Sequence, residues 1–273
     1  MWRIHKMKIA MIQMDVVHDK EKNIDHALEL IGRACEEDID MAVLPEMFCC
    51  PYSTAYFREY SEEDGGEAQR ALSECAAKHG IYLIGGSIPE IDGDKVYNTS
   101  YVYDREGKRI AKHRKAHLFD IDVEGGQRFF ESDVLTAGEN TTVFDTEFGL
   151  MGLCICFDFR SQELARTMGN RGAKVIFVPG AFNMTTGPAH WEVLFRSRAI
   201  DNQLFTVGVA PARDEKGEYV SYGNSIAVDP WGTVIKRLGA DEETGIVELD
   251  LGKIDSIRRQ LPIIASRKPA LYD

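Results

Sequence analysis

A cysteine at the end of an expected buried strand is the residue in this sequence best placed to act as a nucleophile. The run from Leu150 to Ile155 is apolar on both faces, as in a sheet that helices cover on both sides. We expect the strand to stop at Cys156 and a helix to begin near Ser161. Ligands of such sheets tend to lie beyond the carboxyl ends of the strands. A thiol near a helix N-terminus is also favoured as a thiolate, so Cys156 is a candidate nucleophile.

Two other polar side chains, Glu46 and Lys115, also follow expected strand ends. Together with Cys156 they suit the attack of a thiol on an amide or nitrile carbon. This reaction needs a base for the thiol proton, donors for the developing negative charge and an acid for the leaving amine. Glu46 would be the base and then the acid. Lys115 would stabilise the oxyanion together with the backbone N–H of Phe157. The set contains no obligatory histidine, which separates it from papain-like enzymes.

Each of these residues also has a simpler structural interpretation, and spacing alone leaves it open. Glu46 could oppose a helix dipole in a first helical turn, and Lys115 could be a solvated surface charge. Cys156 could be a buried, unreactive thiol. Cys154 would share a strand face with Cys156 and fill the space below it. The sequence has no second cysteine pair and no spaced pair of histidines, so a zinc site is not expected.

The composition describes an ordinary globular protein and excludes several classes of partner. The chain has 273 residues, of which 44% are hydrophobic and 28% charged, with a formal net charge of -12. This charge argues against a nucleic acid or an anionic membrane as partner, because both would be repelled. We identify no signal peptide, no bilayer-spanning run and no disulfide framework, so we expect a cytoplasmic protein with reduced thiols. Met7 is an alternative start to Met1.

Periodicity and turn residues predict strands that alternate with helices and carry the candidate residues at their ends. The expected helices cover residues 20–37, 67–78, 161–171 and 191–202. The expected strands, besides the one ending at Cys156 and another ending near His113, cover residues 9–14, 41–44, 81–84, 98–103, 142–146, 175–178, 204–210, 225–228, 234–237 and 246–249. Residues 114–130 form a long polar and aromatic connection, which is typical of a functional loop.

A strand–helix–strand pattern that occurs twice in the sequence predicts two similar halves. One strand–helix–strand unit ends in Leu-Pro-Glu at residues 44–46, and another ends in Val-Pro-Gly at residues 178–180. Two such halves would form two sheets that face each other, with helices outside. No linker divides the chain, so we expect one domain over residues 1–273 with its core at about 7–252. Residues 253–273 would form a helix and an arm at a dimer interface.

Three motifs together resemble the carbon–nitrogen hydrolase (nitrilase) superfamily in their order and spacing, and the likeness extends over essentially the whole chain. The motifs are Leu44-Pro45-Glu46, Arg114-Lys115-x-His117-Leu118-Phe119 and Cys154-Ile155-Cys156-Phe157-Asp158. The resemblance implies an α/β fold, namely an α-β-β-α four-layer sandwich with two pseudo-similar halves. It also implies a homodimer in which the layers continue as αββα-αββα.

The resemblance assigns roles to residues as well. It implies Glu46 as the base, Lys115 as the oxyanion stabiliser and Cys156 as the nucleophile. Glu131 matches a second glutamate of the family, and would position the substrate amide and Lys115. No metal and no organic cofactor is implied.

Within the superfamily, the chain is most similar to the omega-amidases. This subfamily hydrolyses the omega-amide of 2-oxoglutaramate and 2-oxosuccinamate to the dicarboxylate and ammonia, and we expect the same here through a cysteine thioester. Tyr52, Phe182 and Thr185 would line the pocket by resemblance. Phe157 stands where tyrosine is common, which affects the pocket's shape but not the backbone donor. The alternatives are an amidase acting on deaminated glutathione or on an N-carbamoyl amine, and a non-catalytic binding protein with the same fold.

Overall fold

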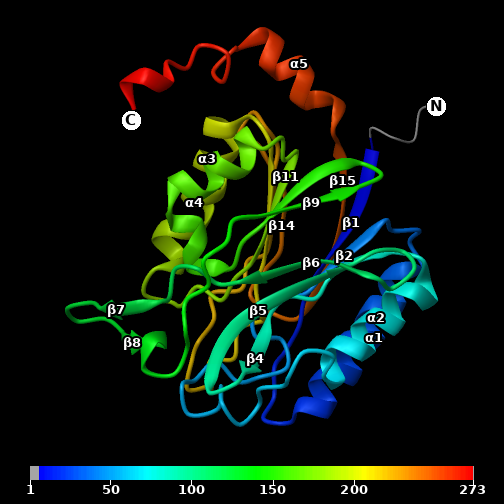
Figure 1. Cartoon of the computed structure of the whole chain (residues 1–273), viewed down its shortest axis with the longest axis vertical. Helices are drawn as coiled ribbons and strands as arrows, with labels where there is room; N and C mark the ends of the chain where they lie inside the picture. The colour runs from blue at the N-terminus through cyan, green and yellow to red at the C-terminus, as the bar shows by residue number, and fades with distance from the viewer. Residues whose placement is uncertain (1–5, 273) are drawn as a thin grey trace.

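Two β-sheets face each other in the computed structural model, which describes residues 6–272, and helices cover the outer side of each sheet (Figure 1). The first sheet has the order β15-β1-β2-β3-β5-β4, with β6 also paired to β5. Its strands are β1 (Lys6–Gln13), β2 (Met41–Val43), β3 (Tyr82–Ile84), β4 (Ile88–Asp92), β5 (Lys95–Tyr103), β6 (Arg109–Arg114) and β15 (Glu243–Asp250). A short hairpin of β7 (Asp120–Asp122) and β8 (Arg128–Phe130) stands apart from both large sheets.

The second sheet repeats the arrangement of the first. Its order is β14-β13-β12-β11-β10-β9. Its strands are β9 (Thr142–Thr146), β10 (Gly149–Leu153), β11 (Val175–Pro179), β12 (Phe205–Val209), β13 (Ile226–Val228) and β14 (Val234–Arg237). In both sheets, three parallel strands lie between antiparallel neighbours: β1-β2-β3 in the first and β10-β11-β12 in the second. The prediction of an α-β-β-α sandwich with two similar halves is therefore confirmed.

The alternation of side chains along the strands explains the four layers. On β1, Ile9 and Met11 are fully buried in the cluster between the two sheets. Ala10 and Ile12 are equally buried, but in the cluster under the helices. Because successive side chains point to opposite faces, a strand that is apolar at every position must be covered on both sides.

The outer layers are four helices whose ends follow from local sequence. They are α1 (Lys20–Cys35) and α2 (Glu67–His79) on the first sheet, and α3 (Gln162–Asn170) and α4 (Gly187–Asn202) on the second. The side chain of Asp19 caps α1 by accepting a hydrogen bond from the N–H of Lys22. Gly80 ends α2 in the left-handed conformation, with φ of 63°.

The structure corrects the expected strand before the nucleophile. Strand β10 ends at Leu153, not at Cys156, and Cys156 opens a 3-10 turn that runs to Arg160. The backbone of Cys156 has φ of 47°, in the left-handed region that ends strands and starts turns. Helix α3 begins only at Gln162, so the turn, and not the helix N-terminus, lies directly after the thiol.

Three other differences concern segments between strands. Helix α4 begins at Gly187 rather than at 191, because Pro188 suits a first helical position. Strand β4 was not expected, since Pro89 interrupts its pattern. It pairs with β5 at the edge of the sheet, where proline is tolerated. The connection at residues 114–130 contains the β7–β8 hairpin.

The C-terminal segment runs across the ends of α3 and α4, at the top of the view in Figure 1. It consists of α5 (Gly252–Gln260) and an arm with a 3-10 turn at Pro269–Leu271. The guanidinium of Arg267 donates to Asn170 at the end of α3, at 3.1 Å. Packing of this segment on a partner subunit remains a prediction. Met1, the other possible start, lies outside the described residues.

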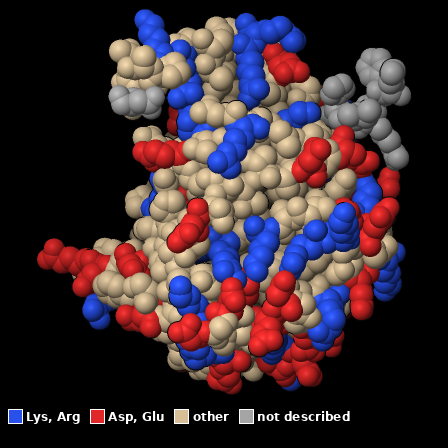
Figure 2. Space-filling model, viewed as in Figure 1, with Lys and Arg blue, Asp and Glu red and all other residues tan. Residues whose placement is uncertain are grey.

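Charged side chains on the molecular face above β5 and β6 are mixed in sign (Figure 2). Arg109 on β6 pairs with Asp64, and Arg114 pairs with Glu90 and Asp92. These basic side chains are therefore neutralised within the fold. None of the helices within residues 6–272 has both the length and the apolar character needed to cross a membrane.

Candidate active site

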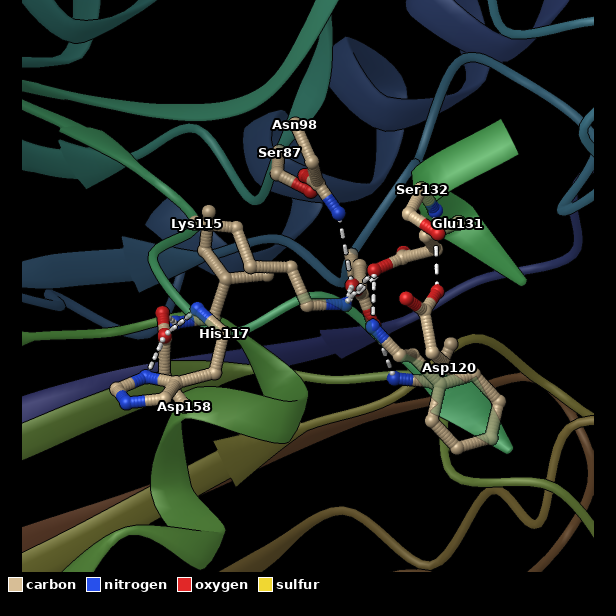
Figure 3. A network of polar contacts seen from close by, with 12 residues as sticks. Ser87, Asn98, Lys115, His117, Asp120, Glu131, Ser132 and Asp158 are labelled. Carbon is tan, nitrogen blue, oxygen red and sulfur yellow. Dashed lines mark hydrogen bonds and ion pairs between the residues drawn. The ribbon is translucent and has the colours of Figure 1, made fainter. Parts of the chain in front are cut away.

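Four predicted site residues converge beyond the strand ends. Glu46 follows β2, Lys115 follows β6, Glu131 follows β8 and Cys156 follows β10. The first three are fully buried, and Cys156 is 3% exposed. Figure 3 shows the ammonium group of Lys115 pointing to Glu131 from one side of this cluster. The structure thus places three segments of the first half of the chain against the nucleophile turn of the second half.

The ammonium group of Lys115 lies between two carboxylates. Its Nζ donates to Oε1 of Glu46 at 2.8 Å, and it lies 3.0 Å from Oε1 and 2.9 Å from Oε2 of Glu131. The hydroxyl of Tyr52 lies 3.4 Å from the same nitrogen. A buried ammonium needs such partners, because leaving it unpaired away from water is very costly.

Glu46 is held in place by donors on both of its oxygens. Oε1 accepts from the side-chain amide of Asn98 at 2.9 Å in addition to Lys115, and Oε2 accepts from the backbone N–H of Ala181 at 2.8 Å. The adjacent backbone is fixed by a close approach to Gly86. A Cβ atom at Gly86 would lie 2.1 Å from the carbonyl oxygen of Pro45, so only glycine fits there.

Glu131 is anchored in the same way. Its Oε1 accepts from the hydroxyl of Tyr52 at 2.7 Å, and its Oε2 accepts from the backbone N–H of Phe119 at 2.7 Å. These bonds fix the carboxylate that faces Lys115. The role of Glu131 in positioning the substrate amide and Lys115 stays a prediction.

Burial and charge set the protonation states of the cluster. Burial alone would lower the pKa of Lys115, but Glu131 and Glu46 outweigh it and raise this pKa above its usual value. Burial raises the pKa of Glu131, although Lys115 opposes the shift. Burial and the charge of Glu46 raise the pKa of Cys156 well above its usual value, and Lys115 only partly offsets them. These shifts favour a neutral thiol at Cys156 and a positively charged ammonium group at Lys115.

A free backbone donor lies next to the thiol. Within the 3-10 turn, the N–H of Asp158 donates to the carbonyl of Ile155 at 3.0 Å. The N–H of Phe157 has no hydrogen-bond partner among residues 6–272. A free N–H beside a nucleophile can hold an oxyanion.

The carboxylate of Asp158 joins the nucleophile turn to the segment that carries Lys115. Oδ1 accepts from the backbone N–H groups of Ala116 at 3.1 Å and His117 at 2.8 Å, and it lies 2.8 Å from Nδ1 of His117. Oδ2 accepts from the N–H of Ile155 at 3.0 Å and lies 2.9 Å from Nε2 of His113. Burial would raise the pKa of Asp158, but the bonds from His113 and His117 outweigh it and hold this pKa well below its usual range.

A cavity of about 390 Å³ reaches the cluster from the surface. Glu46, Tyr52, Ala181 and Tyr219 are among the residues that line it, whereas Cys156 and Lys115 are not. Tyr219 packs on Tyr52 with a ring-centroid distance of 4.4 Å, and its hydroxyl donates to the carbonyl of Ala181.

The other two expected pocket residues do not line this cavity. Phe182 is buried and packs edge-on against Trp191, with the guanidinium of Arg160 4.6 Å above its ring. Thr185 is exposed, and its methyl group lies close to Gly126 in the β7–β8 hairpin. Their role in substrate binding remains a prediction. No group of three or more His, Cys, Asp or Glu side chains within residues 6–272 is arranged to hold a metal ion.

Sequence reasoning gave no role to Asn98, Asp158 or Tyr219, although all three contact or flank the cluster. Asn98 could have been noticed, because an asparagine in an expected buried strand needs polar partners. Tyr219 belongs to a loop without a strand or helix pattern, so nothing local marks it.

Comparison with known proteins places the chain in a family. The family model for "Carbon-nitrogen hydrolase" matches residues 8–259. The chain is 47% identical over 268 residues to a Xenopus laevis protein called "Omega-amidase NIT2-A", covering 98% of this chain and 97% of the relative. It is 45% identical over 265 residues to the human "Omega-amidase NIT2", covering 97% and 96%.

A solved structure has the same fold. The crystal structure of Nit3 from Saccharomyces cerevisiae, described as a member of branch 10 of the nitrilase superfamily, superposes with a TM-score of 0.90. The two chains are 42% identical, and the match covers 97% of each. The fold of this chain is thus shared with a solved relative over nearly the full length of both chains.

Proposed function

Since this chain belongs to the carbon–nitrogen hydrolase family, and so is a hydrolase that acts on amides, we propose that it is an omega-amidase for small 2-oxo acids. The proposed substrates are 2-oxoglutaramate and 2-oxosuccinamate, and the products are the dicarboxylate and ammonia. The observation that carries the proposal is the likeness to omega-amidases over nearly the whole chain. The buried Glu46–Lys115 pair, which acts electrostatically on the buried thiol of Cys156, supports a thiol mechanism.

Acylation begins with proton transfer, because the resting thiol is neutral. Glu46 takes the proton of Cys156 while the sulfur bonds to the amide carbon, and the carbonyl electrons move to oxygen. The ammonium of Lys115 and the N–H of Phe157 stabilise that oxyanion. When the intermediate collapses, the C–N bond breaks and the leaving nitrogen takes the proton from Glu46. Ammonia departs and a thioester remains.

Deacylation runs through the same groups in reverse. Glu46 takes a proton from water as the water oxygen attacks the thioester carbon, and the oxyanion forms again at the same donors. The C–S bond then breaks, the carboxylic product leaves, and the thiol recovers its proton. Glu131 keeps Lys115 charged and in place through both steps, since it lies 2.9 Å from the ammonium nitrogen. The cycle consumes one water molecule for each amide that is hydrolysed.

An ammonia-release assay over a substrate panel tests the proposal. The panel contains 2-oxoglutaramate, 2-oxosuccinamate, glutamine, deaminated glutathione and an N-carbamoyl amine. We expect the highest kcat/KM for the two 2-oxo acid amides, and no turnover of any of them by Cys156→Ala. A clear preference for deaminated glutathione or the N-carbamoyl amine would assign a different amidase activity. Turnover that survives in Cys156→Ala would refute the thiol mechanism.

A further inference from the structure

We infer that Asp158 is a positioning residue that holds the oxyanion donors of both halves of the chain in register with the nucleophile. The inference rests on the proposed thiol mechanism and assigns a role to a residue outside it. Asp158 lies two positions after Cys156 and one after Phe157. Its carboxylate accepts hydrogen bonds from the backbone N–H groups of the two residues after Lys115. One side chain therefore connects the nucleophile with both groups that would hold the oxyanion.

The backbone N–H groups that donate to the carboxylate divide between its two oxygens according to segment. Oδ1 accepts two backbone N–H groups, from Ala116 and His117, that belong to a segment some 40 residues earlier in the chain. Oδ2 accepts the N–H of Ile155, directly before Cys156. The side chain is completely buried, and Figure 3 shows it beside His117, on the opposite side of Lys115 from Glu131. Hydrogen bonds to an ionised, buried acceptor are the strong ones, so the two segments are held rigidly.

We call Asp158, together with the backbone N–H groups and the two histidines that it contacts, the clamp. The clamp joins segments of the two sheets. Lys115 leaves β6 of the first sheet, and Cys156 leaves β10 of the second. The Lys115 backbone is also tied to the first sheet, because its N–H donates to the carbonyl of Asn98 on β5 at 2.8 Å, and its carbonyl accepts from the N–H of Gly138 at 2.8 Å. A small slide of one sheet against the other would therefore separate the ammonium of Lys115 from the thiol. Asp158 and its two histidines oppose that slide.

Misplacement of this kind has a specific kinetic signature. An oxyanion forms in amide hydrolysis but not when iodoacetamide alkylates a thiol, since that reaction displaces iodide at a tetrahedral carbon. Both reactions need Glu46 to take the thiol proton. A loosened clamp should thus slow amide hydrolysis and leave alkylation of Cys156 intact. A general loss of structure would slow both.

The experiment compares Asp158→Asn, His117→Ala and the control His26→Ala with the wild-type chain. Asp158→Asn keeps the side-chain volume but turns one acceptor into a donor that faces backbone N–H groups. His117→Ala removes one clamp contact from a side chain that is 45% exposed. His26 forms a comparable surface pair with Glu242, at a side-chain exposure of 34%. Each variant is assayed for kcat and KM on the best amide, for alkylation of Cys156 by mass spectrometry, and for thermal unfolding.

We expect kcat to fall by about 10²-fold in Asp158→Asn, the scale of a misplaced catalytic group. His117→Ala should show a smaller loss, and His26→Ala none. KM and the alkylation rate should stay near wild type in all three. Unchanged kcat in the two clamp variants, or a parallel loss of turnover and alkylation, would overturn the inference. If Asp158→Asn does not fold, His117→Ala decides on the same criteria. A wild-type chain that hydrolyses no amide would instead refute the proposed function.

Discussion

The thiol of Cys156 depends on a neighbouring base rather than on a low pKa of its own. The expectation that a helix N-terminus favours the thiolate does not fit, because Cys156 opens a 3-10 turn that runs to Arg160 and α3 begins only at Gln162. Burial and the charge of Glu46 raise the thiol pKa, and hydrogen bonding to Glu46 contributes to the same shift. In the proposed mechanism the proton therefore moves as the sulfur attacks, and the rate depends most directly on Glu46.

Replacement of Glu46 by glutamine tests this dependence. Glutamine keeps the shape and can still accept from Asn98 or Ala181, but it cannot take a proton. We expect kcat to fall by about 10²–10⁴-fold, as for other general bases, and alkylation of Cys156 by iodoacetamide to slow as well. Both rates are followed at constant pH, with circular dichroism as the control for folding. Wild-type alkylation in a folded Glu46→Gln protein would show that another group deprotonates the thiol.

At the scale of elements, strands end early and turns carry the chemistry. Strand β10 stops three residues before Cys156, and β6 stops directly before Lys115. Lys115 and Cys156 therefore lie beyond the assigned strands, although the N–H of Lys115 still donates to the carbonyl of Asn98 on β5. Asp158 adds hydrogen bonds to both segments, and its contact with His117 raises the pKa of that histidine above the usual value. The turn and the Lys115 segment are coupled through a titratable pair.

This coupling predicts a pH dependence of stability with a defined sign. Because the folded-state pKa of His117 is raised above 6.5, its charged form stabilises the fold at pH values below 6.5. The contribution disappears as the pH rises through the raised pKa. The melting temperature of wild type should therefore exceed that of His117→Gln by more at about pH 5.5 than at about pH 8.5. A difference that grows toward alkaline pH would contradict the assigned pair.

At the scale of the whole molecule, the two sheets pack through one continuous apolar layer. The layer combines strands of both halves, such as Met11 on β1, Val43 on β2, Phe177 on β11 and Val207 on β12, all fully buried. Because Glu46 and Cys156 come from opposite sheets, the packing of this layer also sets the distance between base and nucleophile.

Truncation of a side chain in this layer should destabilise the fold strongly. Phe177→Ala would leave a cavity between the sheets and lower the free energy of unfolding by about 3–5 kcal/mol. Urea titration followed by tryptophan fluorescence measures the change, and Phe130→Ala, outside the layer on the β7–β8 hairpin, serves as the comparison. Equal effects of the two substitutions would contradict the described core.

The predicted homodimer can be tested through the C-terminal arm. Deletion of residues 261–273 removes the contacts of the arm with Asn170 and Gln203 but leaves both sheets whole. We expect the full chain to elute as a dimer in size-exclusion chromatography with light scattering, and the truncated chain to shift toward monomer. A monomeric full chain would refute the dimer, and an unshifted truncated dimer would place the interface elsewhere.

Local patterns were sufficient for much of the architecture. Continuous apolar runs indicate buried strands, and the helical spacing of apolar residues together with capping residues indicates helices. Most elements were therefore predicted to within a few residues. The two-half arrangement followed from the repeated strand–helix–strand units. Errors arose where a turn residue overrides the pattern, as at Cys156, or where an edge strand tolerates proline, as at Pro89.

The sequence by itself determined the residue types of the site, their places after strand ends and, through the family motifs, the chemistry expected of Glu46, Lys115 and Cys156. Only the tertiary structure decided that these groups touch, since Lys115 and Glu46 are 69 residues apart. It also decided that Asp158 joins two segments of different sheets. The reason is physical: apolar periodicity is a local property of the chain, whereas a hydrogen bond between distant segments depends on how two sheets pack, which no local pattern records.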